Sequence, residues 1–187
     1  MLVLYSWYIA ELECHRDSLI DYLRKTDIMC LQETWTAETI QFKGHATYIT
    51  PSTKKNLFGR QVGGLAIHIS HKSNLQVIPI QTTSHKIQGM RITNLNTGGQ
   101  IQTCTLLNCY IQGTTLEKKS IIRALKDLIE DCSYNNPHDA LIILGDFNMR
   151  NLVKDNAQNQ TPNERGLSEL IEQYNLKSIQ GIAARMQ

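Results

Sequence analysis

The chain has 187 residues, which is the usual size of one domain. Apolar residues make up 41% and charged residues 19%, both slightly below the ~45–50% and ~25% of average globular proteins. Uncharged polar residues fill the difference, with 13 Asn and 14 Gln. This composition excludes collagen-like, coiled-coil and disordered proteins.

The net charge of +2 neither requires nor excludes a nucleic-acid partner, because a nuclease needs only a local basic rim. The five cysteines are odd in number and form no CxxC pair, which favours a reducing, intracellular location, nuclear or cytoplasmic, without a disulfide partner. No apolar run approaches the ~18 residues of a membrane span, so we expect no membrane partner. The apolar start lacks a positively charged region and is read as a strand, not a signal peptide.

The first third of the chain predicts a strand, a helix and a second strand. Leu2–Ile9 is apolar and strand-like. Apolar residues recur at helical spacing over residues 12–25, which predicts an amphipathic helix. The run Asp27–Gln32 follows directly and has the pattern of a buried strand, with a polar loop over Thr34–Gly44.

The middle of the chain predicts a largely antiparallel sheet, because short strands follow one another through turns. The predicted strands are His45–Thr50, the LAIHIS run after Gly63-Gly64, Leu75–Ile80, Lys86–Leu95 and Gln100–Cys109. Pro51–Gln61 is predicted as a loop, and the sequence Asn-Thr-Gly-Gly at 96–99 as a hairpin turn.

The last third predicts a helix over Leu116–Cys132, a buried strand over Ala140–Leu144 and a helix over Glu164–Tyr174, with a strand beginning at Leu176–Ile179. Asn151–Asn163 is predicted as a polar loop. Since no repeat or linker is found, we expect a single domain over 1–187. Helices interleaved with many strands indicate a layered α/β sandwich, but periodicity alone does not choose its topology.

The run LIILGDFN is the strongest local signal for chemistry. An apolar strand is followed by Gly145, then by the carboxylate of Asp146, and two residues later by the amide of Asn148. Residues two apart face the same way if the extended backbone persists, and an acid beside an amide suits metal, water or phosphate. The alternative is a strand-ending turn, where Asp and Asn are common.

Glu33 and Tyr110 follow two other buried runs. Glu33 lies at the carboxyl end of its strand, where ligands bind in α/β sheets, and a carboxylate there is a plausible magnesium ligand. The alternatives are a solvated Glu at a loop start and a Tyr that belongs to the core. For Gly63-Gly64, the alternative to a functional role is a simple turn at the start of a strand.

Other polar groups give weaker signals. Lys54, Lys55 and Arg60 form a loose basic group that could meet a phosphate backbone, although three loop charges are more often simply solvated. His68 and His71 lie three apart in a strand-like run, so they should face opposite sides. No histidine pairs with a Ser or Cys in a nucleophile motif.

Taken in order, these motifs resemble the endonuclease/exonuclease/phosphatase superfamily, and most closely the apurinic-type endonuclease domains of non-LTR (LINE-like) retrotransposons. The matching blocks are Trp7–Leu12, Asp27–Trp35, Gly63–Ser70, Tyr110, Leu141–Asn148 and Asn163–Leu167. The resemblance implies a DNase I-like fold: a four-layer α/β sandwich of two packed mixed β-sheets flanked by helices.

The resemblance also implies roles. Glu33 matches the carboxylate that binds Mg²⁺ (Mn²⁺ as a substitute), and Asp146 the one that orients or activates the attacking water. Tyr110 matches a residue near the scissile phosphate, and Asn148 an amide that contacts it. The implied reaction is nicking of DNA by phosphodiester hydrolysis, with a reverse transcriptase as a partner domain in the parent element.

The chain departs from the family pattern in three places. The first strand carries Tyr8 where the family has Asn, and Glu11 where it has Gly. The family's C-terminal strands, with their Asp and Ser-Asp…His block, have no counterpart before Gln187. We therefore expect a C-terminally truncated domain with impaired activity. Two alternatives stay open: a catalytically dead nucleic-acid- or protein-binding module, and a phosphatase-branch enzyme completed by other sequence.

Overall fold

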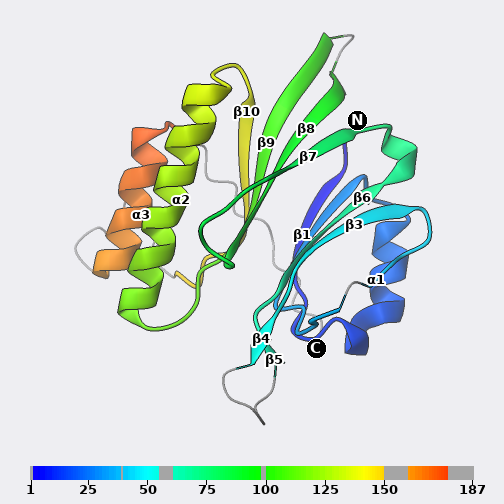
Figure 1. Ribbon diagram of the computed structural model, residues 1–187, viewed down its shortest axis with the longest axis horizontal. Coiled ribbons are helices and arrows are strands. Elements are labelled where there is room, and N and C mark those ends of the chain that lie inside the picture. Colours follow the sequence, from blue (N-terminus) through cyan, green and yellow to red (C-terminus); the bar gives the residue numbers. More distant parts are fainter. Residues whose placement is uncertain (1, 39, 55–60, 98–99, 150–159, 177–187) are drawn as a thin grey trace. The chain divides into compact units, whose positions relative to one another are not determined.

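Two four-stranded β-sheets carry the residues of interest in the computed structural model of the chain (Figure 1). The structure describes residues 2–38, 40–54, 61–97, 100–149 and 160–176. The chain divides into two compact units, Met1–Asn148 and Met149–Gln187. Both sheets belong to the first unit.

The first sheet has the strand order β1-β2-β6-β3. Its strands are β1 (Leu4–Tyr8), β2 (Ile28–Gln32), β6 (Leu65–Ser70) and β3 (His45–Thr50). The β1–β2 pair is parallel, and the other two pairs are antiparallel. Every residue of β2 and β6 is buried. The apolar run of β2 predicts this, whereas β6 also buries the polar His68 and Ser70.

The second sheet has the order β10-β9-β8-β7. Its strands are β7 (Gln76–Ile80), β8 (Ile87–Thr97), β9 (Gln100–Tyr110) and β10 (Ala140–Asp146). The β9–β10 pair is parallel and the others are antiparallel. Each sheet thus joins one parallel pair to an antiparallel remainder, so both are mixed.

A third, two-stranded sheet corrects the predicted loop over Pro51–Gln61. Strands β4 (Thr53–Lys54) and β5 (Gln61–Val62) pair antiparallel within that region. Each strand has only two residues, so neither leaves a period-2 pattern that a sequence can display.

The main apolar core lies between the two large sheets. It combines side chains of the first sheet with side chains of β8 and β9: Ile28, Cys30, Ile67, Ile69, Met90, Ile92, Leu95, Cys104 and Leu106. A second cluster joins the first sheet to helix α1 (Arg16–Leu23) through Leu19, Leu23, Met29 and Leu31. Figure 1 shows α1 outside the first sheet and helix α2 (Thr115–Asn135) outside the second.

Helix α2 begins with a capping box. Thr114 accepts a hydrogen bond from the Glu117 backbone N–H, and the Glu117 carboxylate accepts one from the Thr114 N–H. The predicted amphipathic helix over 12–25 is divided into a 3₁₀ turn, η1 (Glu13–His15), and α1. A second 3₁₀ turn, η2 (His71–Ser73), joins β6 to β7. The second unit contains α3 (Pro162–Gln173), which begins with its own capping box at Thr161.

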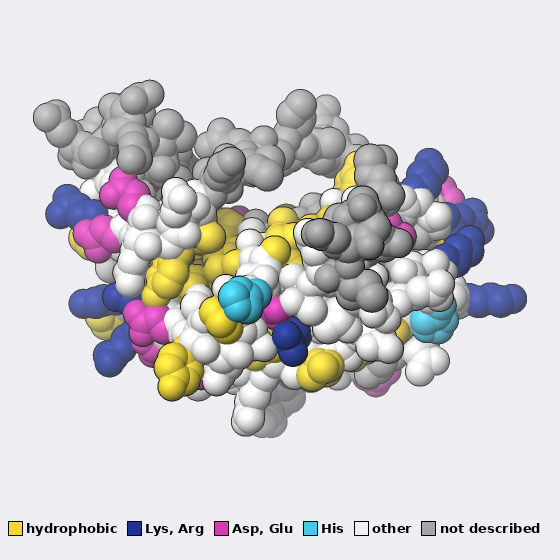
Figure 2. Space-filling view, turned by 90° about the horizontal axis from the view of Figure 1, so that it is seen from above, with side chains coloured by type: hydrophobic (Ala, Val, Ile, Leu, Met, Phe, Trp, Pro, Cys, Tyr) yellow, Lys and Arg dark blue, Asp and Glu magenta, His cyan; other side chains and the backbone are white. Residues whose placement is uncertain are grey.

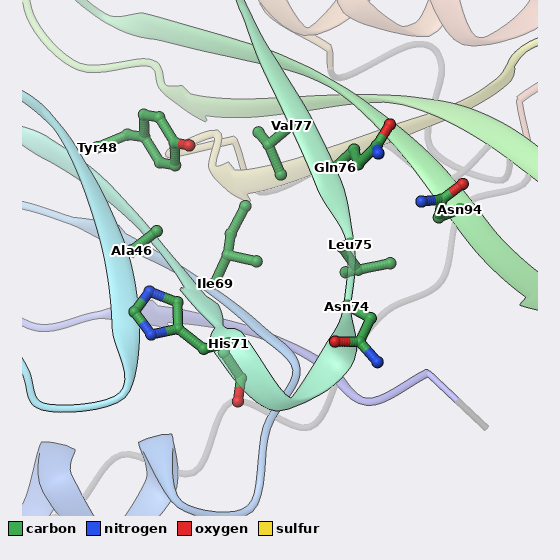
Figure 3. Close-up of a pocket in the computed structure, with 10 residues that line it drawn as sticks. Ala46, Tyr48, Ile69, His71, Asn74, Leu75, Gln76, Val77 and Asn94 are labelled. Carbon is green, nitrogen blue, oxygen red and sulfur yellow. The ribbon is translucent and has the colours of Figure 1, made fainter.

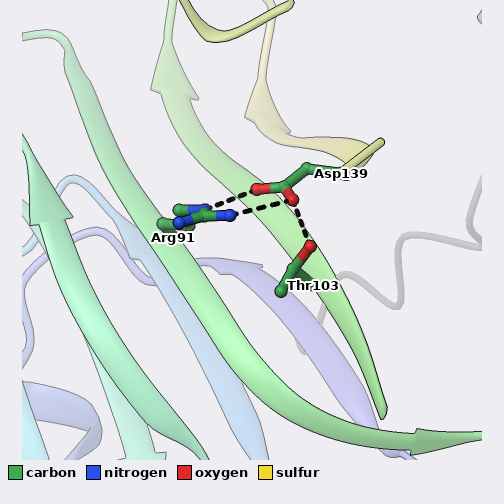
Figure 4. A network of polar contacts seen from close by, with 3 residues as sticks. All are labelled: Arg91, Thr103 and Asp139. Carbon is green, nitrogen blue, oxygen red and sulfur yellow. Dashed lines mark hydrogen bonds and ion pairs between the residues drawn. The ribbon is translucent and has the colours of Figure 1, made fainter. Parts of the chain in front are cut away.

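A polar network holds the second sheet to the residue before β10 (Figure 4). The Arg91 guanidinium on β8 donates to both carboxylate oxygens of Asp139, at 2.7 and 3.2 Å, and Thr103 on β9 donates to the same carboxylate. The Arg91 hydrogen bond lowers the pKa of Asp139 and Thr103 lowers it further. This network fixes the start of β10, whose far end carries Asp146.

The expected fold class is therefore confirmed: mixed sheets packed face to face, with flanking helices. The strand expected from Leu176 lies outside the described residues apart from Leu176 itself, which is not in a strand. Most of the predicted loop over Asn151–Asn163 also lies outside them. None of the helices in the described ranges has the length and apolar character needed to cross a bilayer.

Candidate active site

Glu33 lies buried directly after β2, at one end of the first sheet. Its side chain is 4% exposed, so the interpretation as a solvated loop residue is wrong. Oε1 accepts a hydrogen bond from the Gly63 backbone N–H at 3.1 Å, and Oε2 accepts one from the Trp35 indole N–H. These two donors hold the carboxylate in one orientation.

The Gly63-Gly64 pair has a specific role beside Glu33. Both residues have positive φ, +76° and +89°, a region that L side chains rarely adopt. A Cβ on Gly64 would lie 2.4 Å from Thr34 Oγ1, and one on Gly63 would lie 2.8 Å from Lys86 Nζ. The glycines therefore allow the backbone to approach Glu33 and leave room for a lysine from the second sheet.

Asp146 ends β10 at the corresponding edge of the second sheet. Gly145 before it has φ +140°, and a Cβ there would lie 1.8 Å from the Cys109 carbonyl oxygen. Asn148 donates to Asp146 twice, from its backbone N–H and its side-chain amide, each at 3.0 Å. The two side chains meet through a turn with Asn148 at φ +47°, not through the extended backbone that their spacing suggests.

Two tyrosines, Tyr8 and Tyr110, lie within electrostatic reach of both carboxylates. Tyr110 is paired in register with Asp146, and its ring lies 6.3 Å from the ring of Tyr8 at the end of β1. Burial raises the pKa of Tyr110, and the Glu33 carboxylate raises it further. Burial, Glu33 and Asp146 likewise raise the pKa of Tyr8. Both carboxylates thus act on the same pair of phenols, which stay protonated at neutral pH.

Tyr110 is both a core residue and a member of this cluster. The residue is fully buried, and its hydroxyl donates to Gln112 Oε1. The core alternative for Tyr110 is therefore confirmed, and its role near a scissile phosphate stays a prediction. Tyr8 is 46% exposed, so it forms an open side of the cluster.

Glu11 occupies a backbone conformation that suits glycine. Its φ is +84°, and its N–H donates to the Glu33 carbonyl at 2.9 Å. The Glu11 side chain is half-buried. The free-energy cost of Glu at this position therefore comes from the strained backbone conformation.

A buried pair of side-chain amides, Gln32 and Asn108, lies in the interior next to the cluster. Gln32 Nε2 donates to Asn108 Oδ1, and Asn108 Nδ2 donates to the carbonyls of Leu31 and Ala66. Both side chains are at most 1% exposed. The signal in the sequence was an amide inside each of two apolar strands, which requires buried partners.

Two lysines near the site were not predicted. Lys86 Nζ lies 4.8 Å from the centre of the Tyr110 ring, and Lys118 Nζ on α2 donates to the Asn148 carbonyl at 3.1 Å. Neither lies in a motif, because their proximity depends on the packing of distant segments. They supply positive charge beside the Glu33–Asp146 cluster.

The predicted basic group does not form a described patch. Lys54 is exposed on β4, while Lys55 and Arg60 lie outside the described residues. On the face seen in Figure 2, basic and acidic side chains are interspersed, without one continuous basic surface. The two histidines predicted on opposite sides of one strand-like run lie in different elements. His68 is fully buried in β6 and bonded to Thr47, whereas β6 ends at Ser70 and His71 is exposed in η2.

A pocket elsewhere in the first unit is separate from this cluster (Figure 3). It lies between edge strands β3 and β7. It is also lined by Ile69 and His71, at the end of β6 opposite to the Gly63-Gly64 end. None of its lining residues is a predicted site residue. It is therefore not the site of the predicted chemistry.

The donor set at the cluster suits a magnesium ion that keeps waters and takes substrate oxygens. Such ions need only one or two protein carboxylates, and Glu33 supplies one. In the described ranges, no group of three or more His, Cys, Asp or Glu side chains could enclose a metal ion. This excludes, for those residues, a closed site of the structural-zinc kind.

Comparison with known proteins identifies the family and the fold. The endonuclease/exonuclease/phosphatase family pattern matches residues 8–165. The structure resembles the APE2 catalytic domain of Xenopus laevis (TM-score 0.68, 20% identity, covering 88% of this chain and 66% of that one). It also resembles the 3′ phosphatase NExo from Neisseria bound to a product DNA hairpin (TM-score 0.63, 14% identity, 92% and 71% covered).

An AP endonuclease from Archaeoglobus fulgidus is similar as well (TM-score 0.59, 16% identity, 93% of this chain and 71% of that one). At these identities the likeness concerns the fold. The chain spans between 66% and 71% of these three structures. No curated protein matches the sequence.

Proposed function

Since this chain belongs to the endonuclease/exonuclease/phosphatase family, we propose that it is a divalent-metal-dependent phosphodiesterase that nicks DNA, of the LINE-like retroelement type. The observation that carries the proposal is the placing of two strand-end carboxylates beside one pair of phenols: Asp146 is paired in register with Tyr110, whose ring lies 6.3 Å from that of Tyr8. Glu33, from the other sheet, raises the pKa of both phenols. Two carboxylates at one edge, with protonated phenols and nearby lysines, suit an anionic phosphodiester better than a neutral substrate.

Each side chain then has a role. Glu33, held by Gly63 and Trp35, would hold Mg²⁺, which supplies charge stabilisation at the phosphoryl and leaving oxygens. Asp146 orients or deprotonates the attacking water. Asn148 contacts the phosphate, oriented by its two hydrogen bonds to Asp146, and Tyr110 lies near it. Such preorganised donors are commonly the largest catalytic contribution.

The experiment is nicking of supercoiled plasmid by the purified chain in Mg²⁺, with circular dichroism as the check on folding. Glu33→Gln and Asp146→Asn keep the side-chain shape and remove the charge, so each should lower the nicking rate by about 10²–10⁴-fold. EDTA should abolish nicking, and Mn²⁺ should restore it. A folded chain that does not nick, or nicks equally in both variants, would overturn the proposal.

A further inference from the structure

A second pocket lies next to the Glu33–Asp146 cluster, on the α2 side of the second sheet. It has a volume of about 490 Å³ and is lined by the segment before β8 and by the first half of α2. Pockets of roughly 300–1,000 Å³ are the usual size for small-molecule ligands. This pocket can therefore take a group as large as one nucleoside.

Two of its lining residues connect it directly to the candidate site. Lys86 lies over the Tyr110 ring, and its carbonyl accepts the Tyr110 backbone N–H at 2.9 Å. Gln112 accepts the hydrogen bond of the Tyr110 hydroxyl. A group bound in the pocket would thus be one residue away from Tyr110.

Helix α2 forms the other connection. Lys118 in its first turn donates to the Asn148 carbonyl, while Ser120 and Arg123 further along line the pocket. The same helix therefore borders both the candidate site and the pocket. A nucleic-acid strand that runs along α2 would pass from the candidate site to the pocket.

The charges of the pocket indicate what kind of group it takes. Two cations, Lys86 and Arg123, face two carboxylates, Glu117 and Asp127, so the lining has no net charge. A free anion would gain little from such a lining. A nucleobase, which carries donors and acceptors on one edge, matches it better, with hydroxyl and amide partners at Ser120 and Gln112.

His85 adds an aromatic surface. His85 is an exposed residue that lines the pocket. Partial burial of its ring and the adjacent Lys86 both lower its pKa, so the imidazole is neutral at pH 7. Bases of single strands commonly stack on aromatic and histidine rings. Lys86 lies between the pocket and Tyr110, so its ammonium group is positioned for the phosphate attached to a nucleoside in the pocket.

We propose that this pocket binds the nucleoside next to the cleaved phosphodiester, with His85 stacking on the base, Arg123 and Asp127 at its polar edge and Lys86 at its phosphate. The choice of substrate class rests on the proposed function. The pocket itself is testable by binding alone, without cleavage.

The test uses a fluorescent single-stranded DNA decamer and the same decamer with every base replaced by an abasic spacer, both in EDTA. The parent chain should bind the normal strand at least fivefold more tightly than the abasic strand, since one stacked base is worth roughly 1–3 kcal/mol. His85→Ala should remove this difference. Arg123→Gln should weaken binding of the normal strand by at least fivefold.

Lys126→Gln is the matched control, because Lys126 lies on the same helix, pairs with Glu130 and does not line the pocket. Its effect should stay below twofold, and circular dichroism should show every variant folded. Equal effects of Lys126→Gln and Arg123→Gln, equal binding of the two strands, or no binding of either would overturn the inference. Base-dependent binding by a chain that does not nick DNA would instead overturn only the proposed function.

Discussion

Gln32 and Asn108 join the two sheets beneath the candidate site, with Gln32 Nε2 2.7 Å from Asn108 Oδ1. Both residues lie near the site end of a strand. Gln32 is the last residue of β2, directly before Glu33, and Asn108 comes two residues before Tyr110, the last residue of β9. The pair therefore sets the separation of the groups on which the proposed chemistry depends.

Replacing Asn108 by leucine keeps the branching of the side chain at Cγ but removes three hydrogen bonds. The Gln32 amide and the carbonyls of Leu31 and Ala66 lose a buried partner. The free energy of unfolding should fall by about 3 kcal/mol, measured in urea at neutral pH. The control is Gln32→Leu combined with Asn108→Leu, which should recover part of the loss because no unpaired amide remains; strictly additive costs would contradict this account.

Alanine at Gly145 should prevent normal pairing of β10 with β9. Its Cβ would lie 1.8 Å from the Cys109 carbonyl, and backbone must move to relieve that contact. We expect a loss of at least about 3 kcal/mol in the free energy of unfolding. Gly44→Ala is the matched control, because Gly44 also has positive φ, +82°, but nothing lies within 4 Å of a Cβ there. Its cost should be only about 1–2 kcal/mol, and similar losses in both variants would refute the steric explanation.

His68 should make the fold sensitive to acid. Burial, with a contribution from His45, lowers its pKa from 6.5 to about 3. A histidine with a lowered folded-state pKa contributes its full stability above pH 6.5 and loses it as the pH falls toward 3. Between pH 7 and pH 4 the loss should be roughly 3 kcal/mol.

The measurement is urea unfolding across that range for the parent chain and for His68→Gln, which cannot be protonated. The difference between the two proteins isolates His68 from the carboxylates that titrate in the same range. Parallel stability curves for parent and variant would show that His68 does not titrate in this way.

Glycine at position 11 should stabilise the chain. Glu11 has φ +84°, where a residue with a side chain is strained by about 1–2 kcal/mol, and glycine returns part of this as unfolded-state entropy. We expect Glu11→Gly to raise the free energy of unfolding by about 0.5–1 kcal/mol in the same urea experiment. Glu13→Gly, in a 3₁₀ turn that needs no positive φ, should lower it instead. A destabilising Glu11→Gly would mean that the side chain contributes more than its backbone costs.

Local sequence patterns were sufficient for most individual elements. The apolar runs of β2, β6 and β10 and the helical spacing of α2 and α3 predicted those elements to within a few residues. These signals are short-range, because each element places its own apolar side chains on the core. The short β4–β5 hairpin was missed because strands of two residues leave no alternating pattern.

The candidate site shows the same division. Glu33 and Asp146 were singled out because each stands at the end of an apolar run. The prediction of a buried strand is confirmed for β2, but it is wrong for β10, which is only half-buried. Lys86 was missed because its place beside Tyr110 depends on where β8 pairs with β9. The turn that brings Asn148 onto Asp146 could not be predicted from spacing, which suggested an extended backbone.

The origin of Glu33 and Asp146 in separate sheets has a consequence for inactivation. If the sheets slide or part, the two carboxylates separate even though the hydrogen bonds within each sheet remain. Such local opening requires less free energy than complete unfolding. Heating should therefore destroy the arrangement of the carboxylates while the far-ultraviolet spectrum still reports intact strands, and the lifetime of the site is set by the layer of side chains between the sheets.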